Sequence, residues 1–187
     1  LQGLLVAFHI HDLDDAKAAV IAGADISAHG VRDVDVDDEF ISLMVENNVW
    51  YIPTINLDEG EYVYAEHPEW LDDPFIAGAF SEELRTRIAD EQWRQQAIAS
   101  NDDKREAVAT NIRNLRRLHE AGAAIAMGTD AQGTAMRVAG FAEHRELELM
   151  VQAGMSALEV LRAATARGAD LMRLEDRGRL AEDDLAD

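Results

Sequence analysis

Hydrophobic residues along this chain gather in short runs, and each run is followed by a segment with the spacing of a helix. The runs at residues 4–11 (LLVAFHIH), 24–30 (ADISAHG), 49–55 (VWYIPTI) and 123–128 (AAIAMG) have the length of buried strands. Residues 12–22 open with acidic side chains and end before a glycine, as a short crossover helix does, and residues 36–48 repeat this arrangement. Four alternations of strand and helix predict parallel βα units.

The rest of the pattern is mostly helical. Residues 81–100 and 103–121 have the spacing of two amphipathic helices, and a further helix is expected at residues 143–153. The last helix, at residues 156–172, begins with Ser156 and has Glu159 in the position of a capping box. Residues 57–80, rich in aromatic and acidic side chains, show no regular period, and we expect a lid or insertion loop there. The polar residues 173–187 are expected to be extended.

Composition narrows the possible classes of protein. The 187 residues, 48% of them hydrophobic, show no break in composition, so we expect a single domain over residues 1–187. A formal charge of −20 argues against a nucleic-acid partner, because phosphates are bound by clustered Lys and Arg. The apolar runs are too short to span a bilayer and no segment resembles a signal peptide, so we expect no membrane partner and a cytoplasmic location. The lack of cysteine excludes disulfides and thiolate ligands.

Three polar side chains stand where predicted strands end. His9 lies near the end of the first run, His29 lies near the end of the second, and Asp130 follows the fourth in a loop bounded by glycines. The carboxyl ends of parallel strands converge on one face of a barrel, where catalytic groups are found. Two imidazoles and a carboxylate suit Zn²⁺ or another divalent metal and leave a position open for water. A single histidine is more often structural, so this interpretation depends on the three residues together.

Other side chains near these strand ends are candidates for binding a small-molecule substrate. They are His11 at the first strand end, Tyr51, Thr54 and Asn56 around the third, and Arg137 in the loop after the fourth. A guanidinium can bind a substrate carboxylate in bidentate geometry, which is the role we expect for Arg137. Each candidate has a structural alternative. His11 could fill the barrel mouth, the residues of the third strand could brace the long loop, and Arg137 could bind a nearby acid.

Three of these segments resemble those of a known family. VAFHIH, ADISAHG and AMGTDA are similar to strands 5, 6 and 8 of metal-dependent amidohydrolases, in particular the imidazolonepropionase-like and zinc-prolidase-like branch. The resemblance covers nearly the whole chain and implies an α/β fold, a partial TIM-like (β/α)8 barrel with approximately strands 5 to 8 and their helices. It also implies that His9 and His29 bind metal. Asp130 would be a metal ligand and the catalytic residue that moves the proton of the attacking water to the leaving group.

The chain lacks other parts of that family's pattern. Nothing corresponds to strands 1 to 4, which carry a His-x-His pair and usually a bridging lysine or glutamate. His9 and His11 have His-x-His spacing, but the single helix that leads from them to SAHG matches the connection from strand 5 to strand 6. Residues 174–187 resemble the start of the return to a small β-sandwich whose strands are missing. We therefore expect the chain to be the C-terminal half of a catalytic barrel.

The resemblance implies a hydrolase that uses metal-activated water in the intact parent protein. Its substrate would contain an amide or other C–N bond, as in a cyclic amide or a dipeptide-like molecule. An esterase or phosphoesterase with the same metal site is one alternative. A second alternative is an inactive fragment, or a half-barrel binding and assembly module. In either case we expect a partner to cover the open strand edges, either the missing N-terminal half or an oligomer partner.

Overall fold

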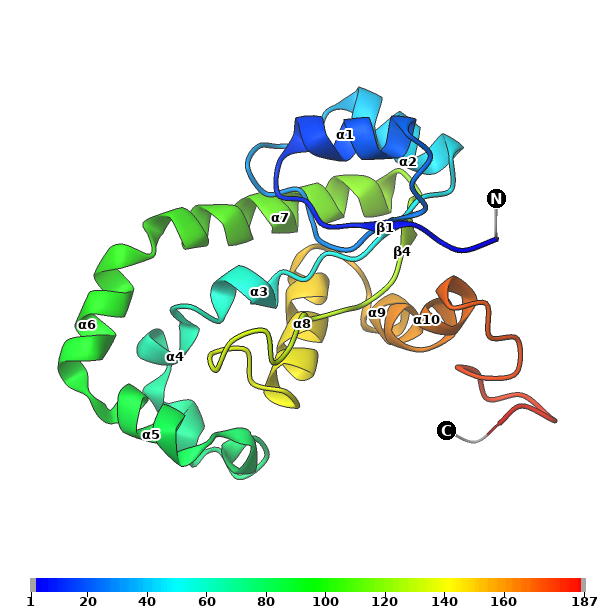
Figure 1. Ribbon diagram of the computed structural model, residues 1–187. Helices are drawn as coiled ribbons and strands as arrows, with labels where there is room; N and C mark the ends of the chain where they lie inside the picture. Colours follow the sequence, from blue (N-terminus) through cyan, green and yellow to red (C-terminus); the bar gives the residue numbers. More distant parts are fainter. Residues whose placement is uncertain (1–2, 186–187) are drawn as a thin grey trace.

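Four parallel strands form the centre of the computed structural model, which describes residues 3–185 (Figure 1). They are β1 (Ala7–Phe8), β2 (Ile26–Ser27), β3 (Trp50–Tyr51) and β4 (Ala124–Ile125), and they are hydrogen-bonded in the order β1-β2-β3-β4. All three pairings are parallel. The predicted strand positions are confirmed, but the strands are shorter than the apolar runs because the ends of each run leave the sheet and form loops.

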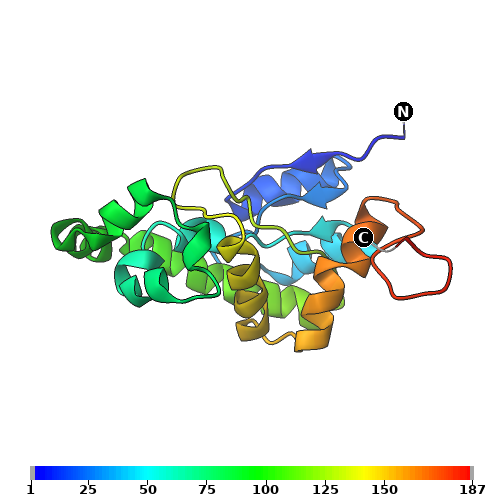
Figure 2. The same cartoon turned by 90° about the horizontal axis from the view of Figure 1, so that it is seen from below.

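Helices connect the strands in the expected order. α1 (Leu13–Ile21) joins β1 to β2, and α2 (Asp38–Glu46) joins β2 to β3. Between β3 and β4 lie α3 (Asn56–Glu59), α4 (Val63–Glu66), the 3-10 helices η1 (Pro68–Asp72) and η2 (Ala77–Ala79), α5 (Glu82–Ala89), α6 (Glu91–Ser100) and α7 (Asp102–Glu120). After β4 come α8 (Phe141–Gln152), α9 (Ala157–Ala164) and α10 (Ala166–Leu171). Figures 1 and 2 show α5 and α6 at the end of the molecule far from α10.

The local sequence explains where several helices begin and end. The Asp37 side chain caps α2 by accepting a hydrogen bond of 2.9 Å from a backbone N–H in the first turn. The predicted capping box of α9 is confirmed, since the Ser156 hydroxyl accepts from the Glu159 N–H and the Glu159 carboxylate accepts from the Ser156 N–H. Gly23 and Gly122, just after α1 and α7, have φ values of 90° and 81°, which only glycine adopts readily.

The sheet separates two groups of hydrophobic side chains, because alternate residues of a strand point to opposite faces. Tyr51 and Ile125 belong to the main core, together with Leu115 of α7. On the opposite face, Ile26 belongs to a smaller cluster that includes Leu171 of α10. The main core therefore holds the sheet against its helices, while α10 covers part of the other face.

Residues 57–80 are not the open loop that their pattern predicts. They contain most of α3 and all of α4, η1 and η2, and the side chains of Tyr62, Val63 and Tyr64 are buried. The helices in this segment are only three to five residues long. Elements this short do not show a clear hydrophobic period, so the sequence pattern missed them. A role of this segment as a lid stays a prediction.

Two predicted helices are each divided in the structure. Residues 81–100 form α5 and α6 because Asp90 caps α6, accepting hydrogen bonds from the N–H groups of Gln92 and Trp93 at 2.9 and 3.3 Å. Residues 156–172 form α9 and α10, which meet at Thr165 with a non-helical φ of −124° and ψ of −88°. In both cases the helical spacing of hydrophobic residues continues across the break, so the sequence pattern predicts one helix where the structure has two. Residues 173–185 contain no helix or strand, and residues 186 and 187 of the expected β-sandwich return lie outside the described residues.

Both outer strands of the sheet have an open edge. Within residues 3–185, β1 pairs only with β2 and β4 pairs only with β3. The side chains of Leu4 and Val6, just before β1, are 80% and 54% exposed. Apolar side chains beside an unpaired strand edge are typical of a surface that another segment covers. In the described part of the chain, no helix is long and apolar enough to cross a membrane.

Candidate active site

The predicted site residues follow the carboxyl ends of the strands. His9 comes directly after β1, His29 follows β2, and Asp130 follows β4. Because the strands are parallel, these ends lie along one edge of the sheet. The rings of His9 and His29 are in contact there, with their centroids 4.4 Å apart and an interplanar angle of 87°. The fold therefore brings together two residues that are separated by a complete strand-helix unit in the sequence.

Thr54, in the segment that follows β3, contacts the ring of His29. The His29 side chain is 7% exposed, and its Nδ1 atom lies 2.8 Å from the Thr54 hydroxyl oxygen. Thr54 has a φ of 45°, which is unfavourable for a β-branched residue and occurs mainly at functional positions. Because Nδ1 is engaged with Thr54, Nε2 is the ring nitrogen that is left to bind an external ligand.

The environment of His29 keeps its ring neutral. Burial lowers the pKa of His29 to about 4, and the neighbouring His9 adds to this effect. The carboxylate of Asp130 acts in the opposite direction and raises the pKa of His29, which indicates that the two side chains are near each other. A neutral imidazole is the form that binds a metal ion, so His29 is in a suitable protonation state at neutral pH.

Asp130 lies in a loop that is anchored to α8. Its φ is 54°, and its Oδ2 atom lies 2.5 Å from Nη1 of Arg137. The hydroxyl of the preceding residue, Thr129, donates to Glu143 Oε1 at 3.1 Å. The other oxygen of Glu143 accepts from the Gly140 N–H at the start of α8. The loop therefore has a defined position, and in it the carboxylate of Asp130 is paired with a guanidinium.

The donor types fit a divalent metal, although the third donor is separate from the first two. Among residues 3–185, no three His, Cys, Asp or Glu side chains are close enough together to hold a metal ion. His9 and His29 are in contact, and Asp130 is near His29 but paired with Arg137. Two imidazoles and a carboxylate are ligand types that zinc prefers. The ligand set of His9, His29 and Asp130 stays a prediction.

Two of the predicted substrate contacts are enclosed in the fold. Tyr51 is fully buried, and its hydroxyl accepts from the Val31 N–H at 3.0 Å and donates to Asn111 Oδ1 at 3.4 Å. These contacts support the segment that follows His29. Asn56 is also fully buried, and neither polar atom of its side chain has a hydrogen-bond partner among the described residues. The contacts of Tyr51 are those of a supporting residue, and a substrate contact by Asn56 stays a prediction.

The other predicted substrate contacts lie near the histidine pair. Thr54 contacts His29 directly. The His11 side chain is 51% exposed, and its Nδ1 lies 2.7 Å from Asp12 Oδ1. Arg137 binds Asp130, in agreement with the alternative that it pairs with a nearby acid. Substrate binding by Thr54, His11 and Arg137 stays a prediction.

Several buried charged residues beside the site are not indicated by the sequence pattern. Arg32 is 9% exposed, and its Nε atom lies 2.7 Å from Oδ2 of Asp58. Glu146 of α8 is fully buried and accepts hydrogen bonds from the N–H groups of Ile55 and Asn56 at 2.9 and 2.8 Å. Burial raises the pKa of Glu146 to about 8, although these two hydrogen bonds favour its charged form. Charged residues usually lie on the surface, so the sequence pattern does not predict that these residues are buried. The short distance in sequence from His29 to Arg32 is the one signal that could have drawn attention to Arg32.

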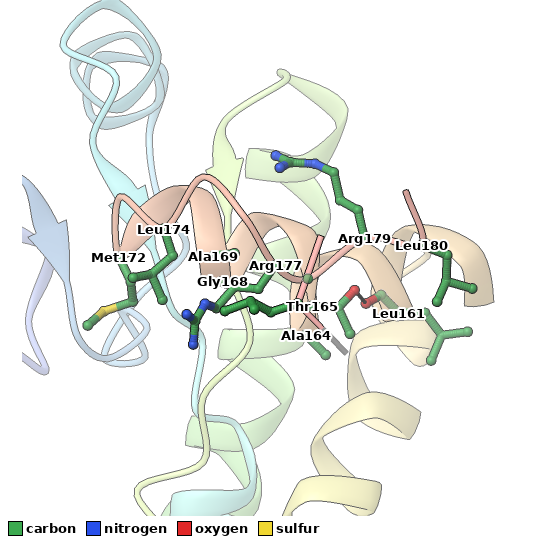
Figure 3. A pocket seen from close by; sticks show the side chains of 12 residues that line it. Leu161, Ala164, Thr165, Gly168, Ala169, Met172, Leu174, Arg177, Arg179 and Leu180 are labelled. Carbon is green, nitrogen blue, oxygen red and sulfur yellow. Dashed lines mark hydrogen bonds between the residues drawn. The ribbon is translucent and has the colours of Figure 1, made fainter. Parts of the chain in front are cut away.

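A separate cleft of about 740 Å³ lies between α9, α10 and residues 174–185 (Figure 3). Its lining is mostly apolar and includes Leu161, Met172 and Leu180. None of the predicted site residues lines this cleft. This cleft is therefore separate from the strand ends that carry the predicted site.

Comparisons with known proteins agree with the resemblance. The sequence model of the Amidohydrolase family matches residues 2–187. Among solved structures, a Xaa-Pro dipeptidase with bound methionine has 30% identity and a TM-score of 0.63, and the match covers 98% of this chain and 38% of the dipeptidase. A putative prolidase from Bifidobacterium longum has 26% identity and a TM-score of 0.64, with coverage of 97% and 40%. Ochratoxinase from A. niger, at 22% identity, has a TM-score of 0.61, with coverage of 98% and 34%. A comparison with curated proteins gave no match.

The parallel βα units and the polar residues at their carboxyl ends define a partial TIM-like barrel, as predicted. The chain belongs to the Amidohydrolase family. It spans about two fifths of the length of the solved structures that it matches.

Proposed function

We propose that the intact protein containing this chain is a metal-dependent hydrolase of amide or other C–N bonds. The contact between His9 and His29 is the observation that carries this proposal. Both residues come from segments that resemble metal-binding strands of the family, and the fold places their rings 4.4 Å apart. Membership of the Amidohydrolase family supports a hydrolytic reaction.

His9, His29 and Asp130 are the residues that would hold the metal ion. When bound, a divalent ion such as Zn²⁺ polarises a carbonyl oxygen and lowers the pKa of water. Thr54 orients the ring of His29 so that Nε2 is available. The Asp130 carboxylate takes up a proton from the attacking water and gives it to the leaving nitrogen. Arg137 pairs with Asp130, so metal ligation by Asp130 would require this ion pair to open or to share the carboxylate.

A dipeptide-like substrate is the class that we propose, with a cyclic amide as the related option. The Xaa-Pro dipeptidase and the putative prolidase support this choice, because they are similar to nearly the whole chain at 30% and 26% identity. Arg137 could bind the free carboxylate of a dipeptide once it separates from Asp130. His11 is exposed beside the histidine pair and is a second candidate for substrate contact.

A second half of the barrel would complete the site. The β1 and β4 edges are unpaired among the described residues, and Leu4 and Val6 expose apolar surface beside β1. We propose that an N-terminal half, or a second copy of the chain, covers these edges. A half-barrel that serves only for assembly is the competing proposal, and it rests on the same open edges.

Hydrolysis by the extended protein tests the proposed function. The chain is expressed together with the coding sequence that precedes it in its gene and assayed with Zn²⁺ on Xaa-Pro dipeptides and cyclic amides. Asp130→Asn should lower kcat by about 10²–10⁴-fold, which is the usual contribution of general acid–base catalysis. Asp103→Asn, at an exposed aspartate in the first turn of α7, is the matched control and should leave kcat unchanged. Full activity of Asp130→Asn would contradict the proposal, and assembly without any hydrolysis would favour the assembly module.

A further inference from the structure

Arg32 lies between the ends of β1 and β2 and has no part in the proposed reaction. Its Nη1 atom donates to the carbonyl oxygens of Ile10 at 3.1 Å and Gly30 at 2.9 Å. Ile10 directly follows His9, and Gly30 directly follows His29. One buried guanidinium therefore connects the two backbone segments that carry the histidine pair.

Asp58 and a lysine of α7 fix the other side of this guanidinium. Arg32 Nε lies 2.7 Å from Asp58 Oδ2, and the Asp58 side chain is only 5% exposed. The other carboxylate oxygen, Oδ1, lies 2.9 Å from Nζ of Lys104. Arg32 is ion-paired through Nε and donates two hydrogen bonds through Nη1, and these contacts limit the freedom of its buried guanidinium to move. The position of Arg32 is thus set by α3 and α7, outside the strand ends.

We propose that Arg32, held by Asp58, is a positioning residue that keeps His9 and His29 in contact. Both histidines lie beyond β1 and β2, which are each two residues long. Past the strand ends, one backbone hydrogen bond, from the Arg32 N–H to the His11 carbonyl at 3.1 Å, joins the two segments, and the guanidinium adds two more contacts from the same residue. The planar guanidinium presents several donors in a fixed geometry, which lysine cannot reproduce. The inference rests on the proposed function to the extent that the two histidines are metal ligands.

A second buried ion pair offers a matched control. Arg145 of α8 binds Glu59 of α3 through two contacts of 2.7 and 2.6 Å. The two side chains are 17% and 6% exposed, compared with 9% and 5% for Arg32 and Asp58. The Arg145 pair joins α8 to α3, and within residues 3–185 the hydrogen bonds of Arg145 go to Glu59 and Glu148, not to the segments of His9 and His29. Arg145→Lys should therefore weaken the fold without separating the histidines.

The test compares Arg32→Lys with Arg145→Lys in the 187-residue chain through two measurements. The first is the nuclear Overhauser effect between the His9 and His29 rings in the metal-free protein. The second is the affinity for Zn²⁺, measured by competition with a chelating indicator. Arg32→Lys should lose the ring contact and bind Zn²⁺ about 10–100-fold more weakly, as expected when the support of a metal ligand is removed. Arg145→Lys should keep both properties even where its melting temperature is lowered.

Two other outcomes separate this inference from the proposed function. If Arg32→Lys fails to fold, Asp58→Asn removes the carboxylate charge with little change of shape and should give the same losses to a smaller extent. A ring contact and a Zn²⁺ affinity that are unchanged in the folded variant would overturn the positioning role. A wild-type chain that shows the ring contact but binds no Zn²⁺ would mean that the metal site needs ligands from the rest of the barrel, and the ring contact alone would then decide the role of Arg32.

Discussion

Replacement of Tyr51 by phenylalanine separates its two possible roles. From the sequence, Tyr51 is a candidate substrate contact, whereas in the fold its hydroxyl accepts from the Val31 N–H at 3.0 Å and donates to Asn111 Oδ1 at 3.4 Å. The residue is fully buried, so no water can replace the lost partner. Tyr51→Phe should therefore lower the free energy of unfolding.

The size of this effect follows from the hydrogen bonds that are lost. A buried N–H without an acceptor costs about 1–3 kcal/mol, and the longer contact to Asn111 adds less. Tyr62→Phe makes the same chemical change at a side chain that is 6% exposed. The Tyr62 hydroxyl has no hydrogen bond within residues 3–185, and its ring contact with Arg105, at 4.6 Å, is retained in phenylalanine. Tyr62→Phe should change the free energy of unfolding by less than about 0.5 kcal/mol.

Urea unfolding followed by tryptophan fluorescence measures both variants. With an m value of about 2–3 kcal/mol per molar urea, the midpoint of Tyr51→Phe should fall by about 0.3–1.5 M, and that of Tyr62→Phe should stay near the wild-type value. Equal midpoints for Tyr51→Phe and the wild type would refute a supporting role. A raised KM in the intact enzyme, together with an unchanged urea midpoint, would support a substrate contact by Tyr51.

Two further predictions concern packing and pH. Gly30→Ala places a Cβ atom 2.1 Å from the Oδ1 atom of the buried Asn111, so it should lower the free energy of unfolding by about 1–3 kcal/mol. An unchanged urea midpoint of this variant would contradict the close packing of Gly30 against Asn111. Because the pKa of Glu146 is about 8 in the fold and about 4.3 in an unfolded chain, the native state holds the extra proton between these values. The Glu146 contribution to stability should therefore fall as pH rises from about 5 to 8, whereas the lowered pKa of His29 acts in the opposite direction below its ordinary value of 6.5. The difference in urea midpoint between the wild type and Glu146→Gln isolates the Glu146 contribution, and it should shift against the wild type as pH rises across that range.

The strand positions and the histidine contact could be predicted because both depend on local pattern. Four apolar runs separated by helices imply parallel strands, and parallel strands bring the residues at their carboxyl ends to one edge. His9 and His29 follow adjacent strands, and their rings are in contact. Asp130 follows β4, which two strands separate from the β1 of His9 and one strand separates from the β2 of His29, and the pattern could not indicate that Arg137 would pair with the Asp130 carboxylate.

The buried charges could not be predicted because their partners are distant in the sequence. Glu146 lies on an amphipathic helix, where a glutamate is predicted to be exposed. In the fold it instead accepts a hydrogen bond from the backbone N–H of Ile55, which is 91 residues earlier. Asp58 lies in a segment without a regular hydrophobic period, and its buried carboxylate is paired with both Arg32 and Lys104. Such contacts arise only when the complete fold has formed, and no local pattern encodes them.

The most direct measurement is the zinc content per chain of the gel-filtered 187-residue protein, with His29→Ala as the comparison. If His9 and His29 bind metal, the wild-type chain should take up about one Zn²⁺, and His29→Ala should lose it while keeping the wild-type far-UV circular dichroism. Zinc content that is the same in His29→Ala would contradict a metal site at this histidine pair, and a folded wild-type chain that takes up no Zn²⁺ would contradict a site formed by this chain without the rest of the barrel.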